Sequence, residues 1–279
     1  MLHQMIQTFK SAFVLSPGHS STLILLAIAF GIVLGGIWLV LFWPPMFKKP
    51  WLWGVIIASA IFTWAAVAFV EIPLEIWSQE VGNHFWDPAK LQYIDLMLLV
   101  GIPQMLFVGI VEEAAKLVPV LFYWCGSKRS LTPKLGLIVG AVSGAGYGIF
   151  EAIYKININS VYHWNWSSAG IGQHGILSSV FSIIFHTAST SLLGYGLTKH
   201  KAWLYFMIVA LAHGFVDYVS IILQAYNRLT TIQAYLSEGI LLLAITFVVL
   251  WLRWHKTKEI TVDNTQSVVP HINQQPPIG

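Results

Sequence analysis

The chain has 279 residues, of which 56% are hydrophobic and 10% are charged. Soluble domains carry roughly 25% charged residues, so this composition excludes a protein whose surface is mostly exposed to water. The formal net charge of +3 is small, and no nucleic-acid partner is expected from it. The sequence therefore indicates an integral membrane protein surrounded by the lipid bilayer.

Apolar stretches long enough to cross a membrane recur along the chain. A transmembrane helix needs about 20 predominantly apolar residues. The stretches predict an all-α fold, a polytopic membrane helix bundle with about seven transmembrane helices. The apolar stretch Ile94–Val100 leaves open an earlier start of the third span, and Pro103 is expected to kink or break it there. In chain order the predicted spans are Thr22–Trp43, Trp51–Val70, Ile102–Trp124, Leu135–Tyr154, Ile176–Leu197, Trp203–Leu223 and Leu236–Trp251.

The charges between the spans predict how the chain is oriented. Ten of the 15 Lys and Arg residues fall on one side, whereas the acidic segment Glu71–Asp87 is expected to be a loop on the other side. Cytoplasmic loops are enriched in Lys and Arg. A multi-pass protein of the cell membrane is predicted, with its N-terminus outside and its C-terminus in the cytoplasm. Residues 1–256 form the predicted membrane domain, and the polar residues 257–279 form a predicted disordered cytoplasmic tail.

Several ionisable residues fall inside these apolar spans. Charge in the hydrocarbon region costs several kcal/mol by most estimates, so such residues usually face the bundle interior and have a function. They occur on the third to sixth spans, in four clusters. The clusters are Glu112, Glu113 and Lys116; Glu151 and Lys155; His186 and Thr190; and His213 and Asp217.

The spacing of these residues indicates which side chains share a helix face. Residues four apart lie on the same face of a helix, as do the two ends of each cluster. Glu112 is expected to pair with Lys116, and Asp217 is expected to orient the His213 ring. Counting along the spans at about 1.5 Å per residue, the four clusters are predicted to meet between the bilayer midplane and the outer leaflet.

The fourth span is rich in small residues. Small residues let membrane helices approach closely, and they can also leave room for a cavity or a substrate helix. The sequence leaves both interpretations open. The glycines concerned are Gly136, Gly140, Gly144, Gly146 and Gly148.

The four clusters together resemble the PrsW family of intramembrane proteases, which is related to the CAAX prenyl endopeptidases and to bacteriocin-processing proteins. The EExxK motif stands here as Glu112 to Lys116, and a glycine-rich stretch leads from Gly144 to Phe150 and Glu151. A His–Thr pair and an HxxxD motif follow on the next two spans. The YhfC-like membrane metalloproteases show a similar double Glu. Tyr154 departs from the family pattern, because it comes one residue too early after Glu151.

The resemblance implies an intramembrane endopeptidase that hydrolyses a peptide bond of a membrane-spanning substrate, such as an anti-sigma factor. Hydrolysis needs an activated water and a stabilised oxyanion. Glu112 is the candidate general base, with Lys116 keeping it charged and His186 holding the same water. His213 with Asp217 is the candidate oxyanion donor, and Glu113 and Glu151 are expected to orient these groups or to bind metal. The cut is expected near the outer membrane boundary.

Two questions stay open at the level of sequence. No HExxH motif is present, but His and carboxylate side chains are ligands that zinc prefers. If a metal is bound, the expected ligands are Glu112, Glu151, His186 and His213. Buried Glu, His and Asp also form proton relays, so a proton- or ion-coupled transporter is the alternative function. Transporters commonly show internal repeats, and the two halves of this chain show no similarity.

Overall fold

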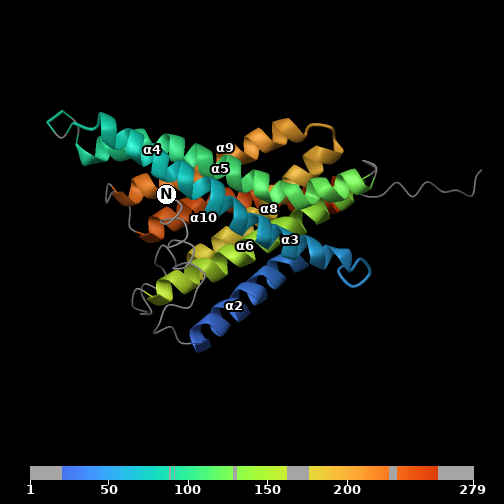
Figure 1. Ribbon diagram of the computed structural model, residues 1–279. Helices are drawn as coiled ribbons and strands as arrows, with labels where there is room; N and C mark the ends of the chain where they lie inside the picture. Colours follow the sequence, from blue (N-terminus) through green and yellow to red (C-terminus); the bar gives the residue numbers. More distant parts are fainter. Residues whose placement is uncertain are drawn as a thin grey trace, which may run out of the picture.

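The computed structural model describes residues 21–87, 89–90, 92–127, 131–161, 176–225 and 231–256, and all regular structure in these ranges is helical (Figure 1). The predicted all-α fold is thus confirmed, whereas the predicted tail, residues 257–279, lies outside the described residues. The α-helices are α2 (Ser21–Val40), α3 (Trp51–Ala66), α4 (Ile72–Phe85), α5 (Tyr93–Gly126), α6 (Pro133–Val161), α8 (Ile176–Thr198), α9 (Ala202–Ala225) and α10 (Thr231–Trp251). Short π-helical segments, η1 (Val67–Glu71) and η2 (Leu252–Lys256), follow α3 and α10.

Several of these helices are suited to cross a membrane. Three helical stretches are long and apolar enough among the described residues, namely Trp51–Phe85, Pro133–Lys155 and Ser178–Thr198. Shorter apolar helical stretches are Ile28–Val40, Ala202–Tyr218 and Leu242–His255. A multi-pass membrane protein follows from these helices, while the number of seven spans and the orientation stay predictions.

The predicted acidic loop after the second span is wrong. Residues Trp51–Phe85 form one continuous helical stretch, in which η1 links α3 to α4 (Figure 1). Pro73 does not end this stretch, although a proline inside a helix removes one backbone hydrogen bond, and it lies just after the π-helical segment η1. The acidic residues Glu71, Glu75 and Glu80 therefore lie on a helix that packs along α5.

The third predicted span begins earlier than Ile102, as the apolar stretch Ile94–Val100 had left open. Helix α5 starts at Tyr93 and continues through Pro103 and Pro119. Its start is fixed by a capping box, in which the Gln92 backbone N–H donates to Asp95 at 3.0 Å. Such a box satisfies two backbone groups that would otherwise lack partners at a helix start. The expected break at Pro103 does not occur, although a proline does remove one backbone hydrogen bond there.

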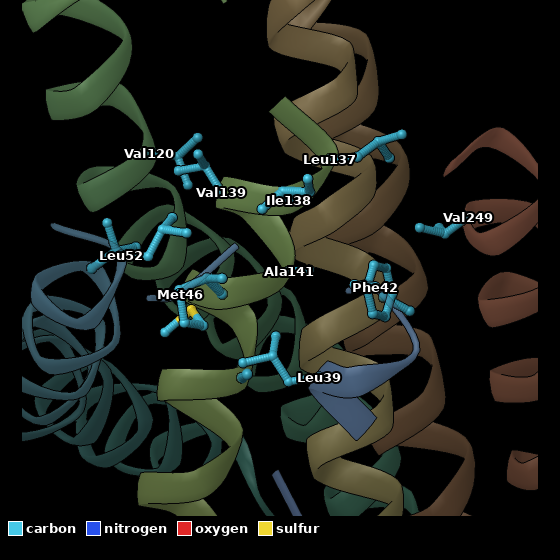
Figure 2. Close-up of a cluster of buried hydrophobic side chains, with 14 of the residues drawn as sticks. Leu39, Phe42, Met46, Leu52, Val120, Leu137, Ile138, Val139, Ala141 and Val249 are labelled. Carbon is cyan, nitrogen blue, oxygen red and sulfur yellow. The ribbon is translucent and has the colours of Figure 1, made fainter. Parts of the chain in front are cut away.

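Helices α6 and α8 form the most extensive helix pair of the bundle. A buried apolar cluster surrounds the first turns of α6 and the last turns of α8. Figure 2 shows how Leu39, Phe42 and Met46 from the α2–α3 region reach this cluster. Leu137, Ile138 and Ala141 of α6 lie in the same cluster, as does Val249 of α10. The outer helices therefore hold one end of the α6–α8 pair in place.

Buried hydroxyl groups tie the central helices together. Ser59 of α3 donates to the Ser143 carbonyl of α6 at 2.7 Å, and Ser143 donates to the Lys116 carbonyl of α5 at 2.6 Å. Ser191 of α8 donates to the Leu137 carbonyl of α6 at 2.9 Å. Polar side chains that hydrogen-bond across helices add to packing inside a membrane protein, and this chain of bonds holds the Lys116 backbone near α6.

Candidate active site

The structure brings members of all four predicted clusters together, with Thr190 as the exception. Close backbone packing between the helices that carry them explains why they meet. A Cβ atom at Gly144 of α6 would lie 1.9 Å from the His186 carbonyl oxygen of α8. A Cβ atom at Gly109 of α5 would lie 2.2 Å from the Ala210 carbonyl oxygen of α9, and one at Gly214 would lie 2.4 Å from the Met105 carbonyl oxygen. Only glycine permits these approaches, so the small residues of α6 serve close packing.

The fully buried ammonium group of Lys116 is the centre of the site. Its Nζ lies 2.6 Å from Glu113 Oε1 and 2.7 Å from His186 Nδ1. The expected pair with Glu112 is present but longer, at 3.9 Å. The predicted Glu112–Lys116 pair is thus confirmed, and the shorter contact with Glu113 was not predicted, although residues three apart can meet as well as residues four apart. An ammonium group only donates, so Nδ1 of His186 is the acceptor in this bond.

The His213 ring is held by carboxylates on both of its sides. Its Nδ1 lies 2.9 Å from Glu113 Oε1, and its Nε2 lies 3.5 Å from Glu112 Oε2 and 3.4 Å from Asp217 Oδ2. The predicted pairing of His213 with Asp217 is therefore present. A carboxylate that accepts Nδ1–H fixes the tautomer and leaves Nε2 available for a further ligand.

Glu151 organises the opposite side of the site. Its Oε2 lies 2.5 Å from His186 Nε2 and also accepts the hydroxyl of Ser182, and its Oε1 lies 2.7 Å from Lys155. The predicted Glu151–Lys155 pair is present. Both ring nitrogens of His186 are thus engaged, one by Lys116 and one by Glu151. His186 is therefore held more tightly than His213 in this state.

Three of the residues meet the geometry of a metal site. Single donor atoms of Glu112, His186 and His213 lie within 4.8 Å of one another, and all three residues are buried. Glu112 Oε2 and Glu113 Oε2 are buried without a hydrogen-bond partner among the described residues. Around this group, four carboxylates (Glu112, Glu113, Glu151 and Asp217) face two ammonium groups (Lys116 and Lys155). The remaining negative charge and the unpartnered oxygens fit a divalent cation. Glu151, which the sequence analysis included among the expected ligands, lies outside this group of three and contacts His186 instead.

Thr190 does not share the site in the way its spacing suggested. It is buried, and its hydroxyl has no hydrogen-bond partner within the described part of the chain. The Thr190 carbonyl lies against α6, because a Cβ atom at Gly140 would lie 2.2 Å from it. Thr190 thus belongs to the packed face between α6 and α8.

Tyr147 belongs to the site but was not predicted from the sequence. This tyrosine lies inside the glycine-rich stretch of α6, between Gly146 and Gly148, and is 1% exposed. Its ring centroid lies 4.5 Å from that of His186 and 4.5 Å from Lys116 Nζ, a distance at which a cation is attracted to an aromatic face. Its hydroxyl also interacts with Glu112. The sequence feature that could have identified Tyr147 is its position one helical turn before Glu151, whereas the family pattern drew attention to Tyr154.

Glu71 is the second residue that the sequence analysis missed, because it was assigned to a loop. The residue ends the π-helical segment η1 and is buried, and its Oε2 has no hydrogen-bond partner among the described residues. It lies within electrostatic range of Glu112, Glu151 and Asp217. π-helical segments inside helices are frequent at functional sites. The signal in the sequence was the spacing of Glu71 and Glu75, which puts both on one helix face.

The chain was compared with known proteins and with models of protein families. No curated protein and no solved structure matches the chain. The family model described as PrsW family intramembrane metalloprotease matches residues 48–253, a range that contains every residue of the site described above. The chain therefore belongs to the PrsW family of intramembrane metalloproteases and is a peptidase.

Proposed function

We propose that the chain hydrolyses a peptide bond of a membrane-spanning substrate near the outer membrane boundary, using a water molecule held among Glu112, His186 and His213. The observation that carries this proposal is the buried group of donor atoms within 4.8 Å of one another. A general base and a stabiliser of developing charge must both lie within reach of the reacting atoms. Family membership favours this reaction over the transporter alternative.

Glu112 is the proposed acceptor of the water proton. Its Oε2 is buried without a hydrogen-bond partner among the described residues and lies 3.5 Å from His213 Nε2. Glu113 and Asp217 hold the His213 ring, which in its protonated form donates Nε2–H to the oxyanion. Glu151 and Lys116 hold the His186 ring from opposite sides. The His213 ring is thus directed toward Glu112 and the His186 ring is fixed beside it before any substrate arrives, which lowers the cost of reorganisation during reaction.

Zinc is the metal that the donor set fits best. Glu112, His186 and His213 supply the carboxylate and imidazole ligands of a catalytic zinc site that keeps its fourth position open. When bound, zinc makes its water a nucleophile near neutral pH, and Glu112 then serves as a ligand instead of as the proton acceptor. Glu113 would act on His213 as the carboxylate partner that zinc-bound histidines usually have. To ligate, His186 would have to release either Lys116 or Glu151.

The proposed substrate is a regulatory membrane protein, such as an anti-sigma factor, that is cut close to its outer membrane boundary. A scissile carbonyl inside a stable helix is hidden in the hydrogen bonds of that helix. The substrate is therefore cut where its helix is unwound. The predicted orientation puts the site between the bilayer midplane and the outer leaflet, which supports an outer-side cut.

The experiment is cleavage of a single-span substrate by the full chain in liposomes. Treatment with 1,10-phenanthroline should abolish cleavage, and added zinc should restore it. Mass spectrometry of the products should place the cut at the outer end of the substrate span. Cleavage that persists after chelation would contradict the metal assignment. A cut on the cytoplasmic side would show that the orientation, and with it the depth of the site, is wrong.

A further inference from the structure

The second candidate site is a cavity beside the connection between α2 and α3. It has a volume of about 880 Å³, within the usual range of about 300–1,000 Å³ for ligand sites. The end of α2, the α2–α3 connection and the first residues of α3 and α6 line it, and Arg253 of η2 completes it. None of the ionisable residues of the candidate active site lines this cavity.

The cavity lies at a membrane boundary. Two candidate spans begin beside it, since one starts at Trp51 and the other starts at Pro133. Exposed aromatic side chains lie along its rim, with Trp43 68%, Phe47 93% and Trp53 49% exposed. Aromatic residues are enriched at the level of the lipid headgroups. The Lys and Arg content of the adjoining segments predicts that this boundary is the cytoplasmic one.

The lining combines basic side chains with an apolar wall. Lys48, Lys49, Lys134 and Arg253 line the cavity, and no acidic residue is among its described lining residues. Arg253 is fixed in place, because its Nε donates to the Phe42 carbonyl at 3.1 Å. Within the ranges that the structure describes, no carboxylate pairs with the three lysines. Leu39, Val40 and Leu135 supply apolar surface beside these cations.

We propose that this cavity binds an anionic phospholipid. The lysines would contact the headgroup phosphate, and an acyl chain would lie along the apolar wall of α2 and α6. Charge complementarity selects the anionic lipid over a zwitterionic one, because a basic pocket between membrane helices attracts anionic headgroups. A free anion would satisfy the lysines but would leave the apolar wall without a partner.

The test compares two double variants that remove the same charge. Lys48→Gln/Lys49→Gln removes two lining lysines. Lys199→Gln/Lys201→Gln removes two exposed lysines that lie outside the cavity on the same predicted membrane side. Each full-length protein is extracted from vesicles of phosphatidylglycerol and phosphatidylcholine, and the retained lipid is measured by native mass spectrometry. Unfolding temperatures, followed by tryptophan fluorescence, check that both variants are folded.

The wild type and the Lys199→Gln/Lys201→Gln variant should retain phosphatidylglycerol in preference to phosphatidylcholine. Each lost lining lysine should weaken that retention about fivefold, the equivalent of about 1 kcal/mol per basic residue. Equal retention by the two variants would overturn the proposal, as would equal retention of the two lipids. Displacement of phosphatidylglycerol by inorganic phosphate would show an anion site that does not need the acyl chain, which would also overturn it.

Discussion

At the scale of single residues, the site is held together by a few buried charges that share partners. Glu113 accepts from both Lys116 and His213, and Lys116 also donates to His186. Glu113 and Lys116 are both fully buried, at 0% exposure. Removing one charged member of such a network leaves the charges of the other members unpaired in an environment of low dielectric.

Replacing Lys116 should therefore be costly. Lys116→Met keeps the length of the side chain but leaves the Glu113 carboxylate buried without its cation, 2.6 Å from where the ammonium group stood. We expect a loss of about 3–5 kcal/mol in the free energy of unfolding, the usual cost of breaking a buried pair. Denaturant titration of the purified protein in detergent micelles measures it.

The matched control is Lys90→Met. Lys90 pairs with Asp87 at 3.1 Å with the same spacing of three residues, but its side chain is 82% exposed. Exposed pairs contribute about 0–1 kcal/mol, so this variant should unfold nearly as the wild type does. Equal losses in the two variants would show that Lys116 does not stabilise a buried network.

At the scale of the helices, contact between backbones decides how the site is assembled. Gly144 brings α6 against α8 directly beside His186, and Gly109 and Gly214 bring α5 against α9. The α6–α8 pair and the α5–α9 pair thus each carry part of the site. A change in either spacing moves Glu151 relative to His186, or Glu112 and Glu113 relative to His213.

The change Gly144→Ala should separate α6 from α8. The new Cβ atom would lie 1.9 Å from the His186 carbonyl oxygen, so the backbones must move apart and the bond between Glu151 and His186 lengthens. We expect substrate cleavage to fall at least tenfold and the unfolding temperature to drop, because overpacking costs about 1–3 kcal/mol. Cleavage assays and thermal unfolding measure the two effects.

Gly54→Ala in α3 provides the comparison for this change. Nothing lies within 4 Å of a Cβ atom at Gly54, and alanine is the better helix former by about 1 kcal/mol. This variant should cleave normally and unfold at the same temperature or higher. If Gly144→Ala behaved in the same way, close packing of α6 on α8 would not be what positions the site.

The sequence identified which ionisable residues lie together, whereas it misplaced several helix ends. Charged residues inside apolar stretches are rare, so Glu112, Glu113, Lys116, Glu151, His186, His213 and Asp217 stood out from spacing alone. The structure brings all of them together. The principal partner of Lys116 could not be predicted, because Glu112 and Glu113 both lie within one helical turn of it. That choice depends on the position of α9, which carries the second partner of Glu113.

The errors in the predicted helix ends arose where polar residues continue a helix. Glu71, Glu75 and Glu80 suggested a loop, but α4 buries one face against α5, and Ser78 and Gly82 lie on its buried side. Tertiary packing stabilises such a helix even though its composition is polar. The early start of α5 was left open because Pro103 follows it, and the capping box at Gln92 was not predicted, since Gln92 and Asp95 depart from the usual Ser/Thr and Glu/Gln pair.

At the scale of the whole molecule, the account depends on which side of the membrane each helix end faces. The lining lysines of the second candidate site and the exposed Lys199 and Lys201 are predicted on the cytoplasmic side, and Lys90 is predicted outside. The candidate active site lies away from the basic side in this arrangement. Orientation thus links the proposed outer cut with the proposed lipid site.

Cysteine labelling in intact cells tests this orientation. In a Cys125→Ser background, which removes the chain's single cysteine, Lys90→Cys should react with an impermeant maleimide. Lys201→Cys should react only after the membrane is made permeable. Both positions are exposed. The opposite labelling pattern would reverse the orientation and the expected position of the cut.

The central claim is that Glu112, together with His186 and His213, holds and activates the water that hydrolyses the peptide bond. Its most direct test is cleavage of a co-expressed single-span substrate by the wild type and by Glu112→Gln, which keeps the size of the side chain but removes its charge. The account predicts that wild-type protein releases the product fragment. It predicts that Glu112→Gln releases none while it binds the substrate and unfolds at a temperature close to that of the wild type. Continued cleavage by the folded Glu112→Gln variant would contradict the claim.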